Sequence, residues 1–183
     1  MADTTPCDSS GSIWVQSDLL PDGTYVAAVH YDDDRSRVLG RDAALRYAAT
    51  VHDAATRAEH DAAVVAQMAK LGLPHATAAQ ALWDLRNDRP PLDDAAIAPL
   101  RLKPCVSAQR GVGYLEVQIG ARLVGQWDPD DARDHAANVL TVLAAVDLDA
   151  AYRRYLMTTV ELDAALAQDA VGDLANHIGG GRG

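Results

Sequence analysis

Apolar and polar residues alternate along several short segments of the chain, which is the pattern of half-buried β-strands. These segments fall into two groups of three. The first group is expected at 13–17, 24–31 and 37–39, and the second at 101–108, 114–119 and 122–126. Turn signals such as Pro21-Asp22-Gly23 separate neighbouring segments. The pattern therefore predicts two sets of antiparallel strands.

Each group of strands is followed by a long and then a shorter stretch that favours helix. The first long helix is expected from about Asp42 to Leu71, because the stretch has no Pro or interior Gly and Gly72 lies at its end. The second is expected from about Pro129 to Met157, and shorter helices at 76–87 and 160–176. The fold class is therefore α+β, with the order βββαα occurring twice.

The two long helical stretches align at an offset of 88 residues. Residues 42–80 and 130–168 share 11 identities in 39 positions, and seven of these are alanines. Because alanines in Ala-rich helices match by composition, the support for a duplication comes chiefly from the other four identical pairs. These are Asp42/Asp130, Val51/Val139, Asp61/Asp149 and Gln80/Gln168. We interpret the chain as an internal duplication of one βββαα unit. The alternative is two unrelated Ala-rich segments that match by composition.

The duplication suggests a domain organisation. The segment 12–89 is repeat 1 and 100–178 is repeat 2, joined by a Pro-containing connector at 90–99, while 1–11 and 179–183 are expected to be flexible tails. Each long helix carries an apolar stripe. The stripe is small in the first helix where it is large in the second, as at Ala58/Val146. We expect the two helices to pack on each other about a pseudo-two-fold axis, large residues against small.

Charge and hydropathy disfavour several classes of protein. The net charge is −10, and only two lysines occur. Phosphate binding needs clustered basic residues, so a nucleic-acid partner is disfavoured. The acidity favours solubility, or a surface that meets a basic partner or mimics DNA. Because no segment approaches 18 unbroken apolar residues and no signal-peptide pattern begins the chain, we expect a cytoplasmic protein without a membrane span.

Motifs for catalysis or cofactor binding are not found in the sequence. It has no Gly-x-Ser-x-Gly elbow, no P-loop and no GxGxxG fingerprint. The cysteines, Cys7 and Cys105, form no CxxC or Cys/His pattern. We therefore expect neither a cofactor nor a bound metal.

His52 and His60 are the histidines that a metal site on the first long helix would use. Eight residues separate them, which is about 12 Å along a helix and too far for a shared ion. At the offset of 88 they correspond to Leu140 and Leu148. A position that holds Leu in one copy is a packing or interface position, so we interpret both histidines in that way.

Asp61 and Asp149 occupy equivalent positions in the middle of the two long helices, where Asp has poor helix propensity. A carboxylate pair across the pseudo-axis would be suited to acid–base chemistry. A salt bridge or a helix kink is the alternative.

A basic and aromatic cluster near the end of the second long helix is the candidate partner surface. Its residues are Tyr152, Arg153, Arg154 and Tyr155, with Trp127 before the helix. Arg, Tyr and Trp are favoured at protein interfaces. The alternatives are that these side chains cover the edge of the core and that Arg153 pairs with Asp149.

The sequence thus predicts a small acidic protein-interaction or regulatory protein without enzymatic activity. Its partner is expected to be another protein, and a homodimer is one form of that expectation. One alternative is an enzyme or small-molecule binder with its site between the two repeats. A further alternative is a DNA-mimic inhibitor.

Overall fold

The computed structural model describes residues 13–31, 36–87 and 100–179 and has an α+β fold. The predicted tail at 1–11, the connector at 90–99 and residues 180–183 of the predicted tail at 179–183 lie outside these residues, whereas Gly179 is helical and not part of a tail. The strands are β1 (Ile13–Leu19), β2 (Tyr25–Tyr31), β3 (Ser36–Leu39), β4 (Arg101–Val106), β5 (Gly113–Ile119) and β6 (Arg122–Trp127). The helices are α1 (Arg41–Lys70), α2 (His75–Asn87), α3 (Pro129–Thr158) and α4 (Ala164–Gly179).

The strands form two three-stranded antiparallel sheets, in the orders β1-β2-β3 and β4-β5-β6. The central strand of each sheet supplies its most buried residues, which include Val29 in β2 and both Leu115 and Val117 in β5. A β-bulge interrupts the pairing of β5 with β6 between Val117 and Gln118. The predicted antiparallel strands are therefore confirmed in both groups.

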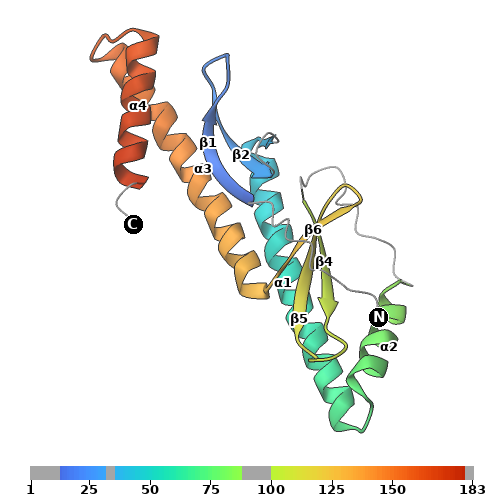
Figure 1. The fold of residues 1–183 in the computed structure, drawn as a ribbon. Helices are drawn as coiled ribbons and strands as arrows, with labels where there is room; N and C mark the ends of the chain where they lie inside the picture. The colour runs from blue at the N-terminus through green and yellow to red at the C-terminus, as the bar shows by residue number, and fades with distance from the viewer. Residues whose placement is uncertain (1–12, 32–35, 88–99, 180–183) are drawn as a thin grey trace, which may run out of the picture.

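The long helices α1 and α3 lie side by side and run antiparallel (Figure 1). Two ion pairs fix their alignment: Arg133 near the start of α3 binds Glu59 of α1, and Arg41 at the start of α1 binds Asp147 of α3. Residues between these ion pairs form the buried seam, including Val51, which is fully buried. The predicted packing of the long helices on each other is confirmed.

Each sheet packs mainly on the long helix of the other half of the chain. Strands β1 and β2 lie on α3, and strands β4 and β5 lie on α1 (Figure 1). At the start of β5 the approach is so close that a Cβ on Gly113 would come 2.4 Å from the carbonyl oxygen of Ala58. Residues from both halves therefore build one shared hydrophobic core.

The difference in size between the equivalent residues Ala58 and Val146 does not serve a contact between these two residues. Because α1 and α3 are antiparallel, Ala58 lies beside the start of α3, where its neighbour Glu59 pairs with Arg133. The backbone of Ala58 instead lies against Gly113 of β5. Val146 lines a hollow beside the β1–β2 turn, together with Gly23.

Several element boundaries differ from the prediction, among them the end of β1 at Leu19 rather than residue 17 and the end of α4 at Gly179 rather than residue 176. Two further differences have local reasons. Helix α4 begins at Ala164 rather than at residue 160, because the Asp163 carboxylate accepts hydrogen bonds from the N–H groups of Ala165 and Leu166, at 3.0 and 2.9 Å. Strand β4 ends at Val106 rather than at residue 108, because the carbonyl of Ser107 accepts the Gly111 N–H and closes a turn.

A buried hydrogen bond joins the first halves of the two long helices. The Tyr47 hydroxyl lies 2.9 Å from Nε2 of His135, and the ring of Trp127 packs against the imidazole with centroids 4.9 Å apart. Burial lowers the pKa of His135 to about 4 and raises the pKa of Tyr47. Both groups are therefore neutral at pH 7, which suits an interior seam.

We expect acidification to destabilise the fold through His135. Its pKa falls from 6.5 to about 4 on folding, so the unfolded chain binds this proton more readily. The stabilising contribution is complete above pH 6.5 and is lost as the pH falls from 6.5 to 4. The loss is on the order of 3 kcal/mol. Denaturant unfolding of the wild type and His135→Gln at pH 7 and pH 4 measures it. Identical pH dependence in both proteins would contradict this assignment.

We also expect that neither half of the chain folds as a monomer, because each lacks the helix that covers its sheet. Fragments divided within residues 90–99 should each lack a cooperative thermal transition as monomers, and mixing them should restore the helical circular dichroism of the intact chain. A monomeric fragment that unfolds cooperatively would show that cover from the other half is not required.

Candidate functional site

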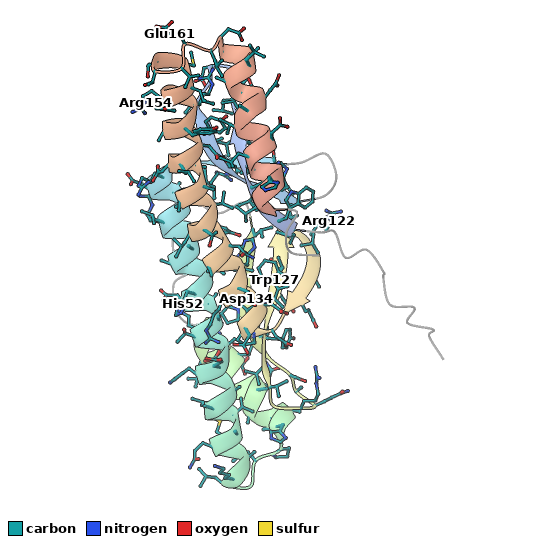
Figure 2. All side chains as sticks on the ribbon, turned by 90° about the vertical axis from the view of Figure 1, so that its left-hand side faces the viewer. His52, Arg122, Trp127, Asp134, Arg154 and Glu161 are labelled. Carbon is teal, nitrogen blue, oxygen red and sulfur yellow. The ribbon has the colours of Figure 1, made fainter. Side chains whose placement is uncertain are left out.

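The residues of the predicted partner surface are divided between the interior and the exterior of the structure. Trp127 ends β6 and packs on His135 in the core. Arg154 lies near the opposite end of α3 (Figure 2), roughly 40 Å away along the helix axis. Trp127 is therefore not brought together with the other four residues.

Tyr152 and Arg153 are half-buried and contribute to packing. Tyr152 borders a small core between α3 and α4 that includes Leu156. Arg153 lies over the β1–β2 turn, where a Cβ on Gly23 would come 3.2 Å from its guanidinium. Asp149 accepts a hydrogen bond of 2.8 Å from Ser17, and within the described residues the Arg153 Nε has no hydrogen-bond partner. The interaction considered between Arg153 and Asp149 therefore does not form.

Arg154 and Tyr155 are exposed on the outer side of α3. Arg154 points away from α4 in Figure 2, and Tyr155 is 52% exposed. Both lie on the face of the helix layer that the two sheets do not cover. Of the predicted surface, these two side chains are available to a partner.

A row of exposed residues continues from Tyr155 along this face of α3. Its members recur every three or four positions, which places them on one side of an α-helix. They are Leu140, Ala144, Leu148, Ala151 and Tyr155, here named the α3 stripe. Leu140 is 47% and Leu148 is 59% exposed. The stripe is about 22 Å long and almost entirely apolar.

The equivalent face of α1 is polar. At the offset of 88 residues, the α3 stripe corresponds to exposed positions, which are His52, Thr56, His60, Ala63 and Gln67. The fold therefore does not require apolar residues at these positions. The sequence signal for this surface was that both histidines align with leucines at the offset of 88. The small residues of the α3 stripe gave no such signal, so sequence analysis missed the stripe as a whole.

A cavity of about 310 Å³ lies between the two halves and is a second candidate site. Helices α1 and α2 line one side, and strands β4 and β5 line the other. Asp61 is buried in its wall and forms an ion pair with Arg86, which also donates a hydrogen bond of 3.3 Å to the Pro104 carbonyl. The salt bridge considered for Asp61 is therefore present.

The outer wall of this cavity combines aromatic, charged and thiol groups. The Lys103 ammonium lies 3.8 Å from the ring centroid of Trp83 and 3.7 Å from the Glu116 carboxylate. Burial, assisted by the negative charge of Glu116, raises the pKa of the Cys105 thiol. Burial also raises the pKa of the Tyr114 hydroxyl. Neither group is activated as a nucleophile at pH 7.

Asp61 and Asp149 are not brought together. Because Asp147 pairs with Arg41, Asp149 lies beside the start of α1, and Asp61 lies 20 residues further along that helix, about 30 Å away. The two carboxylates therefore cannot form a dyad. His52 and His60 are both exposed. Within the described ranges, no group of three or more His, Cys, Asp or Glu side chains is arranged to hold a metal ion.

Comparison with protein-family models, with curated proteins and with solved structures finds no match to this chain. None of the helices in residues 36–87 and 100–179 is long and apolar enough to cross a membrane.

We expect Cys105 to react slowly with iodoacetamide in a Cys7→Ser background. The rate should rise with pH along a curve whose midpoint lies above 9.0, the value of an unperturbed thiol, because burial disfavours the thiolate. The same protein unfolded in guanidinium chloride provides the control. A midpoint at or below 9.0 in the folded protein would show that the thiol is not shielded as described.

Proposed function

We propose that this chain is a small acidic interaction protein without enzymatic activity, and that it binds another protein through the α3 stripe and the neighbouring Arg154. The observation that carries this proposal is the row of Leu140, Leu148 and Tyr155 on the uncovered face of a 30-residue helix. A contiguous exposed apolar surface marks an interaction site more often than scattered apolar residues do.

The chemistry of this surface supports protein binding. Leu148 and Tyr155 supply apolar contact area on a regular helix, and Arg154 at the edge supplies a charged donor. An apolar centre with a polar rim is the usual composition of a protein interface. The apolar character of the row also favours this function over DNA mimicry, which would need rows of exposed carboxylates.

A second candidate function is the binding of a small molecule in the cavity beside Asp61. The specific observation in its favour is the position of this cavity between the two halves, next to Trp83 and Lys103. These groups suit a small ligand that combines an aromatic ring with charge. Because Cys105 and Tyr114 are protonated at pH 7, the cavity favours binding over catalysis. A ligand held there would slow the alkylation of Cys105.

We infer further that the two halves are copies related by a pseudo-two-fold axis. Helices α1 and α3 each have 30 residues, and their starts and ends are both 88 residues apart. Strands β2 and β5 keep the same offset at both ends. Tyr47 and His135, which share a hydrogen bond, are also 88 residues apart. Contact between equivalent residues is expected only near a symmetry axis, so this contact supports the duplication.

We expect the Ala151→Glu variant to lose partner binding while it retains its fold. Ala151 is exposed in the α3 stripe, so a carboxylate there should change the free energy of unfolding by less than about 1 kcal/mol but would be desolvated in an interface. The matched control is Ala63→Glu, the same change at the equivalent exposed position of α1. Affinity capture from the native host with quantitative mass spectrometry compares the two. Equal capture by both variants would argue against the α3 stripe as the binding surface.

Arg154→Glu tests the charged edge of the same surface. Arg154 is exposed, and within the described residues it forms no ion pair. Reversal of its charge should therefore leave the thermal midpoint nearly unchanged and weaken capture of the partner. Marked destabilisation with unchanged capture would make Arg154 a structural residue.

A further inference from the structure

We propose that the partner of the α3 stripe is the same helix of a second copy of this chain, packed antiparallel about a two-fold axis. This inference rests on the proposed function, because it names the occupant of the surface proposed there. It is carried by two observations on α3: the alternation of large and small residues along the stripe, and the charges at its edge.

The alternation of side-chain size makes the α3 stripe complementary to itself. A two-fold axis between Leu148 and Ala151 places Leu148 of each copy against Ala151 of the other. The same axis places Tyr155 against Ala144. Each large side chain thus meets a small one, which is the arrangement that lets two helices interdigitate at close distance. In a parallel pair with matched ends, Leu148 would face Leu148 and Tyr155 would face Tyr155.

The charges on one edge of the stripe are complementary in the same alignment. Asp147 and Arg154 are seven residues apart, so they lie on the same side of the helix. In the antiparallel pair, Asp147 of each copy approaches Arg154 of the other, whereas in a parallel pair this edge of one helix would face the opposite edge of its partner and the two residues would not meet. The Asp147 side chain is 60% exposed although one of its oxygens binds Arg41, and Arg154 forms no ion pair within the described residues.

The neighbouring elements leave this part of α3 accessible. Helix α4 covers a different face, where Leu156 and Tyr152 pack against it. Helix α1 begins at Arg41, beside Asp147, so the last two to three turns of α3 extend beyond it. The outer face of α1 carries His52, Thr56 and His60 in place of the apolar row. We therefore assign the contact to α3 alone.

Complementary charge variants test this arrangement. In the homodimer of Arg154→Glu, the introduced carboxylate would oppose Asp147, and in the homodimer of Asp147→Arg, the introduced guanidinium would oppose Arg154. We expect each variant alone to dimerise about tenfold more weakly than the wild type, or worse, in sedimentation velocity at low ionic strength. An equimolar mixture restores both opposite-charge contacts, so it should recover dimerisation close to that of the wild type. Ala63→Glu serves as the control and should dimerise like the wild type.

The outcomes separate this inference from the proposed function. A wild type that stays monomeric up to submillimolar concentration would overturn the second copy as partner, and so would a mixture that fails to recover dimerisation when circular dichroism shows both variants folded. If Ala151→Glu then still lost capture of a host protein, the interaction function would stand with a different partner. If the wild type dimerises and Ala151→Glu does not, the α3 stripe is the dimer contact.

Discussion

The packing of each sheet on the long helix of the other half is the interaction on which the rest of the structure depends. Strands β1 and β2 need α3 to cover their apolar face, and β4 and β5 need α1. Neither sheet is covered mainly by the long helix of its own half, so the core is shared by both halves. The absence of a Cβ at Gly113 is essential to this packing, because it lets β5 approach the backbone of Ala58.

Two buried polar contacts accompany this packing. Tyr47 and His135 form a hydrogen bond between the first halves of the two long helices, and burial keeps both neutral. Asp61 is buried within α1 and pairs with Arg86 of α2, so the short helix is held against the long one at that point. Loss of one partner in either pair would leave a polar group buried without compensation, which is more costly than loss of the hydrogen bond itself.

The same packing determines which surfaces remain for other molecules. Because both sheets lie on one side of the helix layer, exposed positions remain on the other side of α1 and of α3, where α4 covers only part of α3 (Figure 2). That side is polar on α1, at His52 and His60, and apolar on α3, at Leu140 and Leu148. If the halves began as copies, this difference arose after duplication on a face that the core does not constrain. Because packing in the core does not require apolar residues on this side of α3, we connect their presence with binding.

The sequence by itself determined the local structure and the fold class. The alternation of apolar residues, the turn glycines and the Ala-rich stretches predicted both sheets and all four helices, because these signals act over a few neighbouring residues. Two of the errors in boundaries came from capping and turn contacts, at Asp163 and Ser107. The equivalence of His52 and His60 with two leucines was also visible in the sequence, and the interpretation of these positions as interface positions stays a prediction.

Only the tertiary structure decided which helix covers which sheet and which apolar side of α3 is left exposed. The apolar stripe expected on this helix includes Val139, which is buried, but α3 carries apolar residues on most of its sides, so its periodicity did not show that the face at Leu148 is exposed. For the same reason the sequence could not separate Arg153, held over the β1–β2 turn, from its exposed neighbour Arg154. Those assignments depend on contacts between residues that are far apart in the chain, and local pattern contains no information about them.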